Sequence, residues 1–157
     1  MENFEKELLS EELEARLWKR CLVLTANEDN AQDLMQDTYE KAIKNKSSFV
    51  DGTNMDRWVF TICRNKFIDN QRKKKEYLLG DNLKEIATSG YEKLESVRRD
   101  LLYCLGKLKV IEREIMAMAV GSSYKEIAEE FDLSHTNIRV KVHRAREKLV
   151  ICMGVSQ

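Results

Sequence analysis

Residues 123–149 read SYKEIAEEFDLSHTNIRVKVHRAREKL, and two helix starts stand out in this stretch. Ser123 followed by Glu126 has the form of a capping box, which predicts a short helix. After a turn at residues 132 and 133, Ser134 can cap a second helix. The apolar side chains of that second helix recur at helical spacing, at Ile138, Val142, Ala145 and Leu149. A short capped helix, a tight turn and a second capped helix predict a helix-turn-helix.

The outward side of the second helix is polar and basic. When Ile138 faces inward, a rotation of about 100° per residue turns Thr136, Arg139 and Val140 outward. The first turns of such a helix meet base edges in the DNA major groove. Val140 has two open interpretations, contact with a thymine methyl group or a lone exposed valine. We expect a DNA-reading face, with its later members on phosphates, formed by Ser134, Thr136, Asn137, Arg139, Val140, His143, Arg144 and Arg146.

Charge is segregated along the 157 residues, although 27 basic and 27 acidic side chains give a formal net charge of zero. Residues 57–75, the first basic segment, hold seven basic side chains and one acidic one. From His135 onward, the second basic segment, there are five basic side chains and one acidic one. Each segment by itself is compatible with a solvated helix end. Two of them on helices favour binding to a polyanion such as nucleic acid.

The remaining sequence also has helical periodicity, with no alternation typical of strands. Apolar residues predict a first helix ending near Ala26, through Leu9, Leu13, Leu17 and Leu24. A second helix, capped by Asn27, has a buried stripe at Ala31, Leu34, Met35, Thr38 and Ala42. Asn54 can cap a third helix that runs into the first basic segment. Later apolar residues predict another helix with a buried face of Leu94, Val97, Leu101, Leu105 and Leu108.

The predicted fold class is therefore all-α, with two small helical domains joined by a flexible linker. The domains are expected at residues 1–76 and 91–157, with the helix-turn-helix in the second. Residues 77–90 break the helical pattern with Gly80, Asp81, Asn82 and Gly90, and predict the linker with at most a short helix around residues 83–87.

Several classes of protein are excluded by composition. No apolar run approaches the roughly 20 residues that cross a bilayer, and the acidic N-terminus is not typical of a secretory signal. We expect a soluble cytoplasmic protein. The four cysteines lack the close spacing of zinc ligands, and we expect them to be reduced core residues: Cys21, Cys63, Cys104 and Cys152. No motif predicts a metal or cofactor.

Three motifs, carried by four stretches of the sequence, resemble those of the bacterial ECF (extracytoplasmic-function) sigma factors. GSSYKEIA at residues 121–128 and HRAREKL at 143–149 are similar to the family's fourth conserved region. AQDLMQDT at 31–38 and WVFTICRN at 58–65 resemble its second-region helix and its promoter-melting segment. The resemblance covers roughly residues 5–150. Asn137 and Val140 depart from the family's common Thr and Ser in the reading helix, and Lys109 replaces its usual proline.

The resemblance implies a transcription initiation factor without catalysis of its own. Its partners would be core RNA polymerase, promoter DNA and an anti-sigma factor. The surface for core polymerase would be a polar stripe of Asp33, Gln36, Asp37 and Glu40. The residues for the minus-ten element would be Phe49, Arg57, Arg64, Asn65, Lys66, Arg72 and Lys73, and the loop at residues 46–55 would receive a displaced base. The reading face of the helix-turn-helix would contact the minus-thirty-five element.

Two alternatives use other chemistry. A stand-alone helix-turn-helix regulator would bind symmetric half-sites as a dimer and would leave the first domain without a role. An all-α nucleotide hydrolase would bind Mg²⁺ through Asp33, Asp37 and Glu40, with a facing acidic helix of Glu11, Glu12 and Glu14. That enzyme would leave both basic segments without a role.

Overall fold

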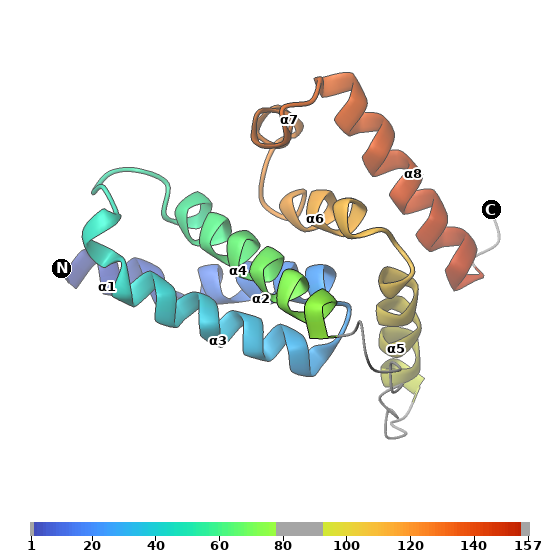
Figure 1. The fold of residues 1–157 in the computed structure, drawn as a ribbon, viewed down its shortest axis with the longest axis horizontal. Helices are drawn as coiled ribbons and strands as arrows, with labels where there is room; N and C mark the ends of the chain where they lie inside the picture. The colour runs from blue at the N-terminus through green and yellow to red at the C-terminus, as the bar shows by residue number, and fades with distance from the viewer. Residues whose placement is uncertain (1, 78–92, 155–157) are drawn as a thin grey trace.

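The computed structural model of the chain describes residues 2–77 and 93–154, and every regular element in these residues is a helix. In chain order they form two groups (Figure 1). The first bundle comprises α1 (Glu2–Leu8), α2 (Glu11–Thr25), α3 (Glu28–Lys44), the 3-10 turn η1 (Lys46–Ser48) and α4 (Met55–Tyr77). The second bundle comprises α5 (Lys93–Gly106), α6 (Val110–Met118), α7 (Tyr124–Phe131) and α8 (His135–Met153). The all-α prediction is confirmed.

The predicted first helix is in fact two helices. The Ser10 side chain accepts a hydrogen bond from the backbone N–H of Leu13 and so starts α2 anew. Leu9 lies at this junction and is 64% exposed, so its place in the buried stripe was wrong. At the other end Ala26 adopts a left-handed conformation, with φ of 55°, which turns the chain into α3.

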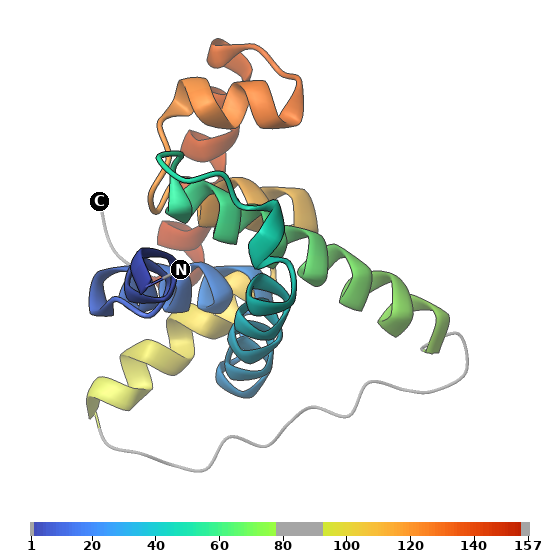
Figure 2. The same ribbon diagram turned by 90° about the vertical axis from the view of Figure 1, so that its left-hand side faces the viewer.

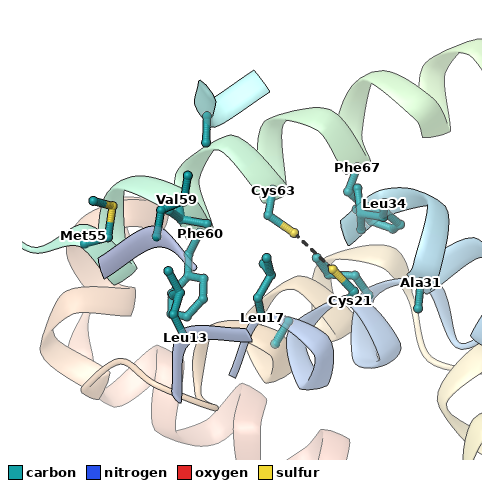
Figure 3. Close-up of a cluster of buried hydrophobic side chains, with 14 of the residues drawn as sticks. Leu13, Leu17, Cys21, Ala31, Leu34, Met55, Val59, Phe60, Cys63 and Phe67 are labelled. Atoms are coloured by element: carbon teal, nitrogen blue, oxygen red, sulfur yellow. Dashed lines mark hydrogen bonds between the residues drawn. The ribbon is translucent and has the colours of Figure 1, made fainter. Parts of the chain in front are cut away.

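The core of the first bundle lies between α2, α3 and α4 (Figure 3). Asn27 and Asn54 accept the capping hydrogen bonds expected of them. The α3 stripe is buried as predicted, except that Met35 is only partly covered. Cys21 of α2 and Cys63 of α4 face each other in this core as free thiols, with their sulfur atoms 3.7 Å apart.

The helix-turn-helix of the second bundle forms as predicted. Ser123 and Glu126 complete the capping box of α7, and Ser134 caps α8 by accepting from the N–H of Asn137. Asp132, with φ of 53°, makes the turn between the two helices. The inward residues of α8 are fully buried at Ile138, Val142 and Ala145.

The predicted buried face of α5 is wrong in its first half. Val97 is 59% exposed and Leu101 is 41% exposed, because the apolar contacts of α5 lie near its C-terminal end, whereas its first half meets α3 through an ion pair between Arg98 and Glu28. There Cys104 and Leu105 are buried, and Leu108 packs beside them after the helix has ended. Leu94, the first residue of this predicted face, has a side chain that lies outside the described residues.

The two bundles pack against each other through α2 and α6. Figure 1 shows α6 between the first bundle and α8, and Figure 2 shows the helix-turn-helix on one side of the first bundle. Ala117 of α6 is buried within the core of the first bundle. Leu105 and Leu108 contact Val23 and Ala26 at the end of α2. The structure is thus a closed arrangement of the two bundles.

One cysteine prediction is contradicted. Cys104 of α5 and Cys152 of α8 form a disulfide, so these two are not reduced thiols in the structure. The sequence did not reveal this pair, because the two cysteines are 48 positions apart in the chain and only the fold brings them together. Residues 78–90 of the predicted linker, with its short helix, lie outside the described residues. Within the described part of the chain, no helix is both long and apolar enough to span a bilayer.

Candidate functional site

The outward face of α8 is open to solvent at each predicted reading position. Exposed side chains extend from the helix cap through its first three turns: Ser134, Thr136, Asn137, Arg139, Val140, His143, Arg144 and Arg146. Val140 is 39% exposed. The opposite side of α8 is anchored by Ile138 and Val142, so burial fixes which side faces outward. An exposed basic helix on a rigid support has the geometry needed to enter a DNA groove.

The predicted polar stripe on α3 also lies at the surface. Asp33, Gln36 and Glu40 are exposed, and Asp37 is partly exposed. The other side of α3 carries Leu34 and the rest of the buried stripe. These carboxylates are therefore available to an outside protein.

Most of the predicted minus-ten residues lie along the open side of α4. Arg57, Asn65, Arg72 and Lys73 are exposed, and Lys66 is partly exposed. These residues give α4 a basic outer side.

Arg64 differs from these residues, because the second bundle covers it. Its guanidinium lies 3.7 Å from a Glu114 carboxylate oxygen and 3.3 Å from one of Glu130. It also stacks over the Phe131 ring, 4.3 Å from the centroid. Its side chain is only 22% exposed. In the closed arrangement, Arg64, which was predicted to contact DNA, is thus paired with acidic side chains of α6 and α7.

Glu114 is a buried carboxyl at this contact. Burial raises its pKa above the ordinary value, while the nearby charge and hydrogen bond of Arg64 act in the opposite direction. Its side chain is 8% exposed. Glu114 therefore depends on the contact with Arg64 for compensation of its charge.

Arg20 is the main residue of this contact that sequence reasoning missed. It lies on α2 at 3% exposure and donates hydrogen bonds to the Met118 carbonyl at 3.1 Å and to Ser122 Oγ at 3.0 Å. Its guanidinium also lies over the Phe60 ring, 3.4 Å from the centroid. Burial lowers the pKa of Arg20 to about 10. The only signal in the sequence was an arginine close to the apolar stripe of its helix.

A small hollow lies beside the loop between η1 and α4. Its volume is about 180 Å³, and it is lined by Asn3, Phe4, Glu7, Phe49, Asp51 and Gly52. Phe49 packs against Phe4 and Trp58, with ring centroids 5.6 and 5.2 Å away. Gly52 has φ of 87°, a conformation that side chains rarely adopt. The α1 residues of this hollow were not anticipated from sequence.

Comparisons with known proteins bear on the same two bundles. Residues 9–77 match the family Sigma-70 region 2, and residues 98–149 match Sigma-70, region 4. The chain is 34% identical over 134 residues to the ECF RNA polymerase sigma factor EcfG of Rhodopseudomonas palustris, covering 82% of this chain and 74% of that protein. The chain belongs to the ECF sigma factor family. A sigma factor is not an enzyme, and its partners are core RNA polymerase and promoter DNA.

Other relatives agree with this assignment. The ECF sigma factor SigM of Bacillus subtilis is 28% identical over 141 residues, with 85% of each chain covered. The solved structure of the sigma factor RpoE in complex with the anti-sigma factor NepR from Bartonella quintana is 30% identical, with a TM-score of 0.79 and all of both chains covered. Because the region 2 match includes α3, the hydrolase alternative is not supported for this sigma factor. The match to region 2 also accounts for the first bundle, which a stand-alone regulator would leave without a role.

Proposed function

We propose that this sigma factor binds core polymerase through α3 and promoter DNA through α4 and α8. The observation that carries the proposal is the exposed basic face of α8 in a domain that matches sigma-70 region 4. Thr136, Asn137 and Arg139 would read base edges of the minus-thirty-five element. Arg144 and Arg146 would hold phosphates and so set the register of the helix.

The core polymerase would bind the polar stripe of Asp33, Gln36, Asp37 and Glu40. Their exposure supports this assignment, as does the separation of α3 from α8 (Figure 1). An acidic surface suits a basic partner and would steer both proteins into register.

The minus-ten element would bind α4 and the loop before it. Arg57, Asn65, Arg72 and their neighbours supply cations and hydrogen-bond donors for a displaced strand. The hollow beside Phe49 supports a role in receiving an unstacked base, because it combines aromatic walls with polar groups.

Full contact with the promoter would require the two bundles to separate. Arg64 faces Glu114 and Glu130 in the closed arrangement, and this position cannot also meet a DNA phosphate. Separation would free Arg64 and would let α4 and α8 reach two promoter elements at once. Binding at two linked sites raises the effective affinity when the geometry allows it.

An anti-sigma factor is a further proposed partner. A similar protein, RpoE of Bartonella quintana, was solved in complex with the anti-sigma factor NepR. By this likeness we expect regulation by an anti-sigma factor, and we expect the sigma factor to act in the cytoplasm.

Run-off transcription with core polymerase from the source bacterium tests the proposal. Adding this sigma factor should produce discrete transcripts from genomic promoters that core polymerase alone does not produce. The double variant Asp33→Asn/Asp37→Asn should bind core polymerase at least ten-fold more weakly than the parent. Asp29→Asn, an exposed change in the first turn of the same helix, is the matched control and should bind normally. Promoter-specific transcription that is unaffected by the double variant would refute the α3 assignment.

A further inference from the structure

The second bundle is joined across its width by a disulfide between Cys104 and Cys152. Cys104 lies in the last turns of α5 and is 3% exposed, whereas Cys152 lies in the last turn of α8 and is partly exposed. Their Cα atoms are 5.8 Å apart, within the range that a disulfide requires. The other two cysteines, Cys21 and Cys63, face each other in the first bundle but remain thiols.

We propose that Cys104 and Cys152 form a reversible redox pair, oxidised by hydroperoxides, that keeps the second bundle folded after it leaves the first. This inference rests on the proposed function, which places the chain in a reducing compartment and requires the bundles to separate. Disulfides in such compartments are usually transient and serve catalysis or redox sensing. A bridge with one accessible end suits that behaviour, because reductants and oxidants can reach Cys152.

Hydrogen peroxide can oxidise the two thiols to the disulfide in two steps. The thiolate of Cys152 attacks one peroxide oxygen, the O–O bond breaks, and the product is a sulfenic acid at Cys152 and water. The sulfur of Cys104 then attacks the sulfur of Cys152, and a second water leaves as the S–S bond forms. Two thiols are oxidised by two electrons, and one hydroperoxide is reduced. A dithiol reductant reverses the reaction by thiol–disulfide exchange.

The closed arrangement explains why the second bundle would need this link. Its own core is small, and part of its apolar surface is covered by the first bundle: Ala117 is buried there, and Leu105 and Leu108 contact the end of α2. Separation from the first bundle removes this support. The second bundle, at about 60 residues, has only a small core of its own, and a covalent link is one way in which domains of this size gain stability.

The position of the bridge makes its effect one of stability rather than of blocking DNA. The second half of α8 meets α5 through Ala145 and Leu149, and the bridge closes this contact at its far end. Cys152 follows Arg146, the last residue of the reading face, by six residues, which is roughly 9 Å along the helix. The reading face therefore stays open in the oxidised state, and the reduced state loses only the link between α5 and α8.

A thiol count tests the pair directly. The full-length protein is treated with hydrogen peroxide, unfolded and alkylated with iodoacetamide, and its mass is measured. We expect two alkylated cysteines after peroxide and four after a dithiol reductant, with the linked peptides containing Cys104 and Cys152. Four alkylated cysteines after peroxide, or a link between Cys21 and Cys63 instead, would overturn the proposal.

Hydrogen exchange of α8 and run-off transcription test the consequence. In the oxidised protein, exchange in the second half of α8 should be at least ten-fold slower, and transcription from a promoter with a minus-thirty-five element should be several-fold higher. Cys152→Ser, at the partly exposed end of the bridge, should match the reduced protein under both conditions. Equal exchange rates in the two redox states would overturn the inference. Thiol counts and exchange need no polymerase, so absence of transcription in both states would refute the proposed function instead.

Discussion

Truncation of Arg20 should weaken the contact between the two bundles by about 2 kcal/mol. Arg20 donates hydrogen bonds across the contact to the Met118 carbonyl at the end of α6 and to Ser122 Oγ just after it, whereas its stack over Phe60 lies within the first bundle. At about 2.5 kcal/mol for each hydrogen bond from the charged guanidinium, the gross gain across the contact is about 5 kcal/mol. Burial opposes this gain, since the lowering of the Arg20 pKa to about 10 corresponds to a cost of about 3 kcal/mol. A net 2 kcal/mol predicts that Arg20→Ala lowers the docking equilibrium about 30-fold.

The two tryptophans make this effect measurable, because Trp18 and Trp58 both lie in the first bundle. In the oxidised parent, urea unfolding followed by tryptophan fluorescence and by far-ultraviolet circular dichroism should give coincident curves. In Arg20→Ala the circular dichroism should change first, because the undocked second bundle unfolds at lower urea than the first. Lys19→Ala, an exposed neighbour on α2, is the control and should behave as the parent. Coincident and unshifted curves for Arg20→Ala would refute the reasoning.

Three further predictions concern the core, a cap and a buried carboxyl. Leu34→Ala should cost about 2–5 kcal/mol of unfolding free energy, because Leu34 is 1% exposed, while Leu9→Ala at 64% exposure should change it by less than about 0.5. Urea titration measures both, and similar losses would contradict the burial pattern. Ser123→Ala should destabilise the second bundle by about 1 kcal/mol, since it removes the cap of α7, and an unchanged melting curve would count against that role. Burial raises the pKa of Glu114 in the folded protein above the ordinary value of 4.5. Between the raised pKa and 4.5, Glu114 is therefore protonated more fully in the folded protein than in the unfolded one. Its contribution to stability should therefore increase as the pH falls through this window. Glu114→Gln should lack that increase, and parallel pH curves for the two proteins would disprove the assignment.

The helix-turn-helix could be predicted closely, because its signals are local. Two serine caps, a turn and a period of 3.6 residues together specify which side of α8 is buried. The same reasoning placed Asp33, Gln36 and Glu40 on the surface of α3. Exposure followed from the sequence, whereas the roles assigned to these side chains stay predictions.

The contact between the bundles could not be predicted, because it joins residues far apart in the chain. The sequence around Arg64 predicts a cation that binds DNA. Only the tertiary structure brings Glu114 and Glu130 next to it. Arg20 gave an even weaker signal, since a single arginine on a helix is usually solvated. The error at Val97 and Leu101 has the same origin, because periodicity shows an apolar face but not whether a neighbour covers its whole length.

The cysteine prediction failed for a different physical reason. Spacing excluded zinc and compartment favoured thiols, but neither argument bears on which cysteines meet in space. Cys104 and Cys152 are brought together only when α8 packs along α5. A disulfide pairing is a property of the tertiary structure and cannot be deduced from sequence spacing alone.

Ala117 of α6 is a position at which a larger side chain would disturb the contact between the two bundles. Its methyl group is 2% exposed in the core of the other bundle, so the surroundings leave little room for a larger side chain. A leucine or phenylalanine at this position would keep the two bundles apart by steric overlap, without a change in any charged residue of the sequence. Such a propped-open protein would let crystallographers and spectroscopists study the extended form without polymerase or DNA.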